Sequence, residues 1–293
     1  MSKIEEALEK ATRRRQGLPA ESPAPGAAGQ LDSGATEPCR VVEEVELDQL
    51  HLVENRLVVA SSPSLGASDA YRQLRVSLML AAEQQKVSFV VTSALQADGK
   101  SLTCLNLGFA IAHEISLDTV VIDADLRRPS LSSFLGIAPH VGLGEYLTDP
   151  SLTIEDAIMR ITDGPLFVPA GRIRLRNTSE LLGSDRMRQF SEELRRLFPG
   201  AIILYDSPPV LPAPDAMALV QWVDGAIFVV RAGKTSRKAL TDSVRQFGAN
   251  RIVGVVVNHS DRGFGYGYNY RYYYAYRDGA ETTDGETPPT SQA

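Results

Sequence analysis

Short apolar segments rich in β-branched residues alternate along the chain with segments of helical periodicity. This alternation restricts the fold more than any other feature. The apolar segments are Val87–Ser93, Thr119–Asp123, Ala201–Asp206, Ala226–Val230 and Ile252–Val257, with Leu166–Val168 as a further short strand. Helical patterns occupy residues 69–84, 100–115, 178–197, 213–222 and 234–248. Strands that are apolar on both faces are typical of a parallel sheet buried by helices. The chain is therefore predicted to form a doubly wound, mostly parallel α/β sheet with helices on both faces.

Composition divides the 293 residues into four parts. Residues 1–16 are predicted to form a short amphipathic helix, because Ser2 and Glu5 have the spacing of a capping box. Residues 17–60 are predicted to be a flexible linker, because their first half is rich in Gly and Pro and nearly free of large apolar side chains. Residues 61–260 form the globular domain, and residues 261–293 a disordered tail.

Charge and cysteine content exclude several classes of protein. The chain carries 30 basic and 36 acidic residues, a net charge of −6, which argues against a general nucleic-acid binder. Its two cysteines cannot build a disulfide framework, so a reduced, cytoplasmic protein is expected. No apolar run reaches the 18 to 20 residues that span a bilayer. A role at a membrane would therefore require recruitment by another protein.

The segment Ala94–Ser101 (ALQADGKS) follows a predicted strand and opens a predicted helix, which is the context of a phosphate-binding loop. Lys100 would reach the β- and γ-phosphates, and Ser101 would ligate Mg²⁺. Alanine replaces the glycine that such loops often have at positions 94 and 97, and a chance Gly-Lys-Ser at a helix start is the alternative. The predicted nucleotide-binding residues are Ala94, Ala97, Asp98, Gly99, Lys100, Ser101 and Leu102. With this loop, the sheet is predicted to be of the P-loop, Rossmann-like type.

Two further apolar strands end in acidic residues. Asp123 and Asp125 follow one strand, together with Arg127, and Asp206 ends another. Ligands of open α/β sheets bind at the carboxyl ends of the strands. Neighbouring carboxylates repel each other unless a cation such as Mg²⁺ lies between them. An ordinary polar turn explains each motif alone, but the three motifs on successive strands indicate a Mg-nucleotide site, with Ser101 and Asp206 as metal ligands and Asp123 and Asp125 facing the same site.

Seven of the ten tyrosines lie within eleven residues near the C-terminus. They are Tyr266, Tyr268, Tyr270, Tyr272, Tyr273, Tyr274 and Tyr276, interleaved with Gly, Asn and Arg. No packed element needs this composition. The cluster is either a sticky low-complexity tail or a set of phospho-acceptors.

The three motifs and the tyrosine cluster together resemble the bacterial tyrosine kinases (BY-kinases) of exopolysaccharide and capsule loci. The similarity covers roughly residues 60–276. It includes Asn177–Ser184 (NTSELLGS), which is similar to the family's Asn-Pro-x-Glu-Leu-Leu segment. It also includes Asp69, Arg72 and Arg75, which resemble an oligomerisation helix with Asp in place of Glu. The opening MSKIEEALEKA resembles the branch encoded with exosortase and PEP-CTERM genes.

The resemblance implies an ATP- and Mg²⁺-dependent protein tyrosine kinase that phosphorylates its own tyrosine cluster in trans. Lys100, Asp123, Asp125, Arg127 and Asp206 are its implied catalytic residues. In this scheme Asp123 is the base for the acceptor tyrosine, and Asp125 and Asp206 bind the metal together with Ser101. Arg127 helps to organise the phosphates, and Asn258 reads the adenine.

The implied partners are further copies of the chain in a ring, an activator of the membrane chain-length class on a separate polypeptide, and a cognate tyrosine phosphatase. The kinase would be cytoplasmic, at the inner face of the membrane, and would regulate polysaccharide polymerisation and export. Two alternatives remain. A Min-type or partition ATPase shares the fold, but its loop carries an extra lysine where this chain has Leu95. A non-catalytic scaffold would bind ATP only to set its assembly state.

Overall fold

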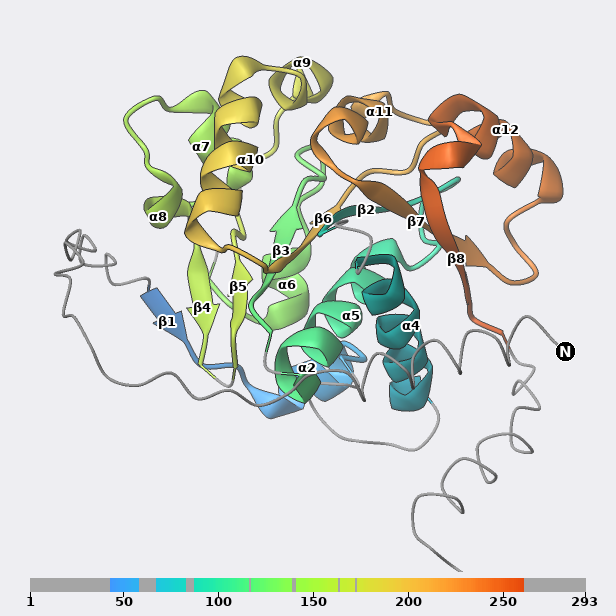
Figure 1. Cartoon of the computed structure of the whole chain (residues 1–293), viewed down its shortest axis with the longest axis horizontal. Coiled ribbons are helices and arrows are strands. Elements are labelled where there is room, and N and C mark those ends of the chain that lie inside the picture. The colour runs from blue at the N-terminus through green and yellow to red at the C-terminus, as the bar shows by residue number, and fades with distance from the viewer. Residues whose placement is uncertain are drawn as a thin grey trace, which may run out of the picture. The chain divides into compact units, whose positions relative to one another are not determined.

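The structure, a computed structural model, describes residues 43–57, 67–82, 87–115, 117–138, 141–162, 164–171 and 173–260. Within these residues, eight strands form one sheet in the order β1-β4-β5-β3-β6-β2-β7-β8 (Figure 1). The strands are β1 (Glu43–Val45), β2 (Ser88–Ser93), β3 (Thr119–Asp123), β4 (Met159–Ile161), β5 (Leu166–Val168), β6 (Ile202–Asp206), β7 (Gly225–Arg231) and β8 (Ile252–Asn258). All neighbouring pairs are parallel except β4–β5, which is antiparallel. The predicted mostly parallel sheet is confirmed.

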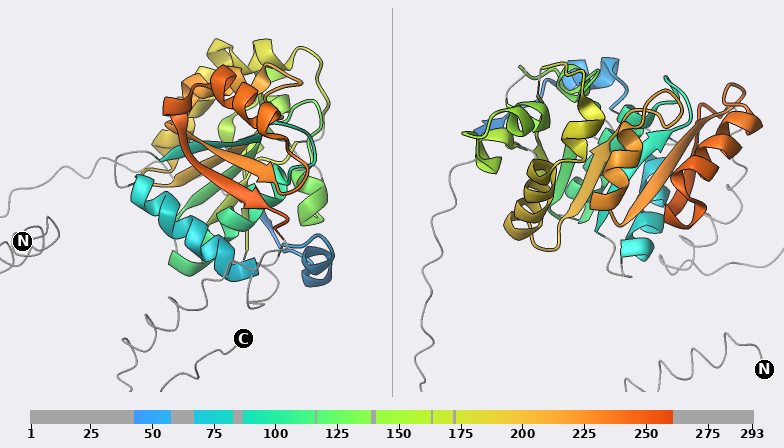
Figure 2. Two further views of the ribbon diagram at one scale, coloured as in Figure 1. Left: turned by 90° about the vertical axis from the view of Figure 1, so that its right-hand side faces the viewer. Right: turned by 90° about the horizontal axis from the view of Figure 1, so that it is seen from above.

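Helices cover both faces of this sheet (Figure 2). One face packs against α2 (Gln49–Glu54), α4 (Ala67–Ala82), α5 (Lys100–Ile115) and α6 (Leu131–Leu135). The other packs against α7 (Leu143–Thr148), α8 (Ile154–Ala157), α9 (Thr178–Leu182), α10 (Asp185–Leu197), α11 (Asp215–Leu219) and α12 (Arg237–Phe247). Successive residues of β2 alternate between the two cores: Phe89 and Val91 join one, and Val90 the other. This alternation explains why the strands are apolar throughout.

The helix predicted over residues 178–197 is divided into α9 and α10. The break lies at Gly183 and Ser184, where the Ser184 hydroxyl accepts a hydrogen bond from the backbone N–H of Met187 (3.3 Å) and caps the new helix. A serine N-cap starts a helix because it satisfies an N–H that has no partner within the helix. Similarly, the helix predicted over 213–222 is α11 followed by a single 3₁₀ turn, Val220–Trp222.

The linker predicted over residues 17–60 is wrong for residues 43–57, which belong to the folded domain. Strand β1 pairs with β4, and Leu47, Leu52 and Leu57 are buried in the core beneath the sheet. These leucines are spaced five apart, which matches neither a helical nor a strand period, and so the segment gave no sequence signal. The predicted N-terminal helix (1–16), the rest of the linker up to residue 42, and the tyrosine tail lie outside the described residues. None of the described helices is long and apolar enough to cross a bilayer.

Candidate active site

The loop between β2 and α5 has the backbone shape of a phosphate-binding loop. It leads directly into the N-terminus of α5, which begins at Lys100. Gly99 has a φ of +96°, and a side chain at this position would collide with the side-chain amide of Asn258. Ala97 also adopts a left-handed φ, +62°. This conformation costs an L-residue about 1–2 kcal/mol. The loop therefore adopts this conformation with alanine at position 97, at a cost in local backbone strain.

Side chains from distant elements hold this loop in place. Asp98 is buried, and its carboxylate accepts hydrogen bonds from the Thr235 hydroxyl (2.9 Å) and from the backbone N–H of Leu95 (3.3 Å). Arg231 donates to the carbonyl oxygen of Ala97 (3.1 Å). Asp98 thus positions the loop through its side chain. Thr235 and Arg231 had no recognisable motif in the sequence, because their role depends on the place of β7 beside β2.

Asp123 and Asp206 end the neighbouring strands β3 and β6 and stand opposite each other in the sheet register. The Asp123 carboxylate accepts hydrogen bonds from the backbone N–H groups of Ser130 (2.7 Å) and Leu131 (2.9 Å). Both carboxylate oxygens of Asp206 are buried, and neither forms a well-directed hydrogen bond with another described residue. The Ser101 hydroxyl lies close enough to lower the pKa of Asp206.

Lys100 reaches this pair of strand ends from the loop. Its Nζ lies 4.0 Å from Oδ2 of Asp125, and both side chains are almost fully enclosed, with 12% and 11% of their surfaces exposed. The structure therefore brings Lys100, Ser101, Asp123, Asp125 and Asp206 together at one edge of the sheet, as the sequence predicted.

Electrostatics marks the carboxylates of this site as unusual. Burial raises the pKa of Asp123 to about 8, and the charge of Asp206 adds to the effect against the hydrogen bonds from Leu131 and Ser130. Burial likewise raises the pKa of Asp206 to about 6, although Lys100 and Ser101 lower it. The pKa of Asp125 is also raised by burial, against the charge of Lys100. Carboxylates that repel each other in a buried site are stabilised by a bound cation.

The donor set fits Mg²⁺. Asp206 offers two buried oxygens without well-directed partners, Ser101 lies beside it, and Asp125 is nearby. No cage of three or more His, Cys, Asp or Glu residues occurs in the described part of the chain. Mg²⁺ is commonly held by one or two carboxylates, with waters and substrate phosphates completing its coordination. The predicted ligands Ser101, Asp125 and Asp206 suit that mode.

Arg127 binds a partner that sequence analysis missed. Its guanidinium makes two hydrogen bonds to the carboxylate of Asp215, with Nε 2.7 Å from Oδ2 and Nη2 3.2 Å from Oδ1. The hydroxyl of Thr178 donates to the same carboxylate (2.8 Å). Asp215 is completely buried at the start of α11. It therefore joins the loop after β3 to the segment Asn177–Ser184.

Asn258, expected to read the adenine, lies at the phosphate-binding loop. Its side-chain amide donates to the carbonyl oxygen of Asp98 (3.0 Å), and its own oxygen accepts from the backbone N–H of His259 (2.8 Å). Asn258, at the end of β8, thus contacts the phosphate-binding loop next to Gly99. The adenine contact remains a prediction.

The arginines of the expected oligomerisation helix lie on α4. Arg72 makes an ion pair with Asp69 within the helix (2.8 Å), and about a third of each side chain is exposed. Arg75 donates to the carbonyl oxygen of Ala110 on α5 (3.3 Å). The contact with another copy of the chain therefore stays a prediction, and the seven tyrosines lie outside the described residues.

The known proteins that are similar to this chain include several named tyrosine-protein kinases. No protein-family profile matches the chain. The tyrosine-protein kinase YwqD of Bacillus subtilis is 27% identical over 221 residues, which cover 72% of this chain and 92% of YwqD. The succinoglycan biosynthesis transport protein ExoP of Rhizobium meliloti is 28% identical over 210 residues, covering 70% of this chain and 26% of ExoP.

The tyrosine-protein kinase Etk of Escherichia coli strain K12 is 30% identical over 215 residues, covering 72% of this chain and 29% of Etk. The solved kinase domain of the Escherichia coli kinase superimposes with a TM-score of 0.59 at 29% identity, covering 66% of this chain and 75% of that structure. The chain thus spans most of YwqD but less than a third of the length of ExoP and of Etk.

Proposed function

Because the chain belongs to the bacterial tyrosine-kinase family, we propose that it transfers the γ-phosphoryl group of ATP to tyrosines of its own cluster at residues 266–276. The observation that carries this proposal is the meeting of Lys100 with the carboxylates of Asp125 and Asp206 beside a phosphate-binding loop. Such a site neutralises and orients phosphates, which is most of what phosphoryl transfer requires.

In the proposed reaction, a bond forms between the tyrosine Oη and the γ-phosphorus while the bond from that phosphorus to the β–γ bridging oxygen breaks. ADP leaves with that oxygen. Asp123, ionised once a bound cation offsets the charge of Asp206, accepts the hydroxyl proton, which is useful because a free tyrosine has a pKa near 10. Lys100 and the N–H groups of the loop stabilise the charge that develops on the transferred group.

Magnesium is part of the proposal. Ser101 and Asp206 would hold the ion, with Asp125 alongside. When bound, Mg²⁺ supplies positive charge to the β- and γ-phosphate oxygens. Arg127 is fixed by Asp215, so its proposed contribution is to keep the loop after β3 in place next to the phosphates. Asn258 supports the loop at Gly99 and is proposed to line the adenine side.

The cellular role proposed here extends from the relatives. ExoP is named for succinoglycan biosynthesis and transport, and we propose that this chain regulates exopolysaccharide polymerisation and export. Phosphorylation in trans within an oligomer that uses Asp69, Arg72 and Arg75, activation by a membrane chain-length protein, and resetting by a tyrosine phosphatase belong to the same proposal. It would place the kinase at the inner face of the membrane.

Incubation of the purified chain with Mg-ATP, followed by phosphosite mapping, tests the activity. The proposal expects phosphotyrosine within residues 266–276 for the wild type and none for Lys100→Met. An exposed lysine on α12 provides the matched control, since Lys238→Met should label normally. ATP turnover without phosphotyrosine would identify a partition-type ATPase instead, and binding without turnover or transfer would identify a scaffold.

A further inference from the structure

The loop after β3 carries two consecutive arginines, and the structure places them in different surroundings. The guanidinium of Arg127 makes two hydrogen bonds to the carboxylate of Asp215, which is completely buried. Moving Arg127 away would leave that carboxylate buried without its cation, which is strongly unfavourable. Arg127 therefore stays with Asp215 and does not supply a mobile charge to a bound phosphate.

Arg128 extends instead to the phosphate-binding loop. Its Nη1 donates to Oε1 of Gln96 (3.3 Å), and Gln96 belongs to the loop between β2 and α5. Both side chains are exposed, and the bond is slightly longer than most N–H···O hydrogen bonds. Within the described part of the chain, it is the one hydrogen bond of the Arg128 guanidinium. Because water replaces such a bond at little cost, the guanidinium can leave Gln96 for a stronger acceptor.

The backbone holds Arg128 beside the proposed metal site. Its N–H donates to the carbonyl oxygen (2.9 Å) and to Oδ1 (3.1 Å) of Asp125. Burial raises the pKa of Asp125, and the charges of Lys100 and Arg128 both oppose that rise. The two cations thus act on the same carboxylate. A phosphoryl group held by Lys100 would therefore also lie within range of the charge of Arg128.

The site has more negative than positive charge once a nucleotide is bound. Asp123, Asp125 and Asp206 face it, and the phosphates add to their charge, against Lys100 and the proposed Mg²⁺. During phosphoryl transfer, negative charge spreads over the oxygens of the transferred group, and cations near these oxygens lower the barrier. An arginine suits this role, because its guanidinium stays charged and offers several N–H donors in one plane.

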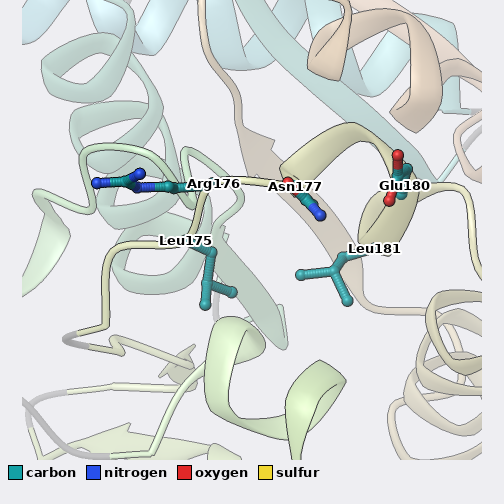
Figure 3. A pocket seen from close by; sticks show the side chains of 5 residues that line it. All are labelled: Leu175, Arg176, Asn177, Glu180 and Leu181. Carbon is teal, nitrogen blue, oxygen red and sulfur yellow. The ribbon is translucent and has the colours of Figure 1, made fainter.

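Arg176 is another arginine close to the loop after β3, but its surroundings do not suit the same role. The backbone N–H of Leu175 donates to the carbonyl oxygen of Leu126 (2.9 Å), which joins the segment before α9 to this loop. A cavity of about 620 Å³ is lined there by Leu175, Arg176, Asn177, Glu180 and Leu181 (Figure 3). The side chain of Arg176 points away from both leucines. Because Glu180 belongs to the same lining, these residues carry no net positive charge for a phosphate.

We propose that Arg128 is a further catalytic residue, which leaves Gln96 and donates hydrogen bonds to non-bridging oxygens of the γ-phosphoryl group during its transfer. Arg128 stays protonated throughout. The bonds that form and break are those of the proposed reaction, and no proton passes through the guanidinium. This inference rests on the proposed kinase function and adds a residue that acts in its transition state.

Binding of a transition-state mimic tests the contact without turnover. The full-length wild type and Arg128→Ala are titrated with fluorescent ADP and Mg²⁺, with and without aluminium fluoride, which takes the place of the transferred phosphoryl group. Arg128→Ala should bind Mg-ADP within about twofold of the wild type, but should lose about 10²- to 10³-fold of the affinity that aluminium fluoride adds, the effect of removing one donor to the transition state.

Arg196→Ala is the matched control, because Arg196 is an exposed arginine at the end of α10. This variant should bind Mg-ADP like the wild type in both conditions. An equal gain of affinity from aluminium fluoride in the wild type and in Arg128→Ala would overturn the proposal.

The rate of phosphotyrosine formation supplies the second measurement. For Arg128→Ala, the rate at saturating Mg-ATP should fall by about 10²- to 10³-fold while the KM for ATP changes by less than about threefold, because the contact forms only in the transition state. A raised KM at an unchanged maximal rate would place Arg128 in ground-state binding and overturn its catalytic role.

Thermal unfolding separates this role from a structural one. Arg128→Ala should keep the wild-type Tm, because the side chain is exposed and its hydrogen bond to Gln96 is long. Arg127→Ala should unfold at a lower temperature, because it leaves the buried Asp215 unpaired. Arg128→Gln also removes the charge while keeping a polar side chain, and it replaces Arg128→Ala in every measurement if the alanine variant folds poorly.

The two proposals fail separately. A weakened response to aluminium fluoride in Arg128→Ala, in a protein that forms no phosphotyrosine, would support the contact of Arg128 and refute the tyrosine kinase. Wild-type rates of phosphotyrosine formation by Arg128→Ala would support the kinase and refute the catalytic role of Arg128.

Discussion

Replacing Asp206 with asparagine should stabilise the nucleotide-free protein at pH 8. Asp206 is completely buried, without a well-directed hydrogen bond among the described residues, and faces Asp123. Its pKa rises from an ordinary 3.8 to about 6. A pKa difference of about two corresponds to about 3 kcal/mol of free energy. Because the buried amide keeps part of the desolvation cost, we expect a gain of about 1–2 kcal/mol, or about 3–6 °C in Tm for a domain of this size.

The stability gained by Asp206→Asn should increase as the pH rises. The folded state holds the Asp206 proton more tightly than the unfolded chain, so wild-type stability falls as the pH rises from about 4 to about 6. Asparagine does not titrate. Removing the charge of Asp206 also lowers the pKa of Asp123, which is about 8 in the intact site. The advantage of Asp206→Asn should therefore be smallest near pH 4 and continue to grow until about pH 8.

Thermal unfolding in a metal chelator at pH 5, 6.5 and 8 measures this effect. Asp224→Asn is a control that should change the thermal stability in the opposite direction. Burial opposes the ionisation of Asp224, but hydrogen bonds from Ser88 and Val87 outweigh it and lower its pKa, so this variant should be less stable than the wild type. A Tm for Asp206→Asn at pH 8 that equals or falls below the wild-type value would show that the buried Asp206 charge does not destabilise the nucleotide-free protein. Added Mg-nucleotide should stabilise the wild type more than Asp206→Asn.

Three further outcomes are expected. Ala97→Gly should raise the free energy of unfolding by about 0.5–1 kcal/mol in a denaturant titration, because glycine adopts a φ of +62° without strain. Asp123→Asn should reduce phosphoryl transfer by about 10²- to 10⁴-fold at unchanged nucleotide affinity, whereas Asp125→Asn should raise the Mg²⁺ requirement; equal loss of nucleotide affinity in both would contradict these roles. Joint replacement of Arg72 and Arg75 by alanine should shift the unphosphorylated protein toward monomer in sedimentation, and an unchanged distribution would argue against α4 as the interface.

The core of the fold follows from local sequence. Strands β2, β3, β6 and β7 are apolar on both faces, and such segments have few alternatives to a covered parallel sheet. The edge strand β8 is equally apolar in sequence, but Val255 and Val257 remain about half exposed. The short elements α6, α7 and α8 had no such signal. Each has six residues or fewer, too few to show a helical period, and their packing on the sheet decides their structure.

The active site, like the fold, could be predicted only in part from the sequence. The ends of parallel strands meet at one edge, so the approach of Asp123 and Asp206 could be predicted from the strands alone. The Arg127–Asp215 pair could not, because 88 residues separate the two partners. Asp215 lies in the first turn of α11, where an acidic residue is common for helix-dipole reasons alone. The supports of the loop, Thr235 and Arg231, likewise depend on the lateral order of β7 and β2, which no local pattern encodes.

Transfer of phosphate between two distinguishable copies shows whether the chain phosphorylates its tyrosine cluster in trans. Full-length Lys100→Met protein is mixed with an active chain whose seven cluster tyrosines are replaced by phenylalanine, and Mg-ATP is added. We expect phosphotyrosine on the Lys100→Met tail, and a wild-type self-labelling rate that rises with protein concentration. An unlabelled Lys100→Met tail, with wild-type labelling independent of concentration, would contradict phosphorylation in trans, and no labelling of any chain would contradict the kinase itself.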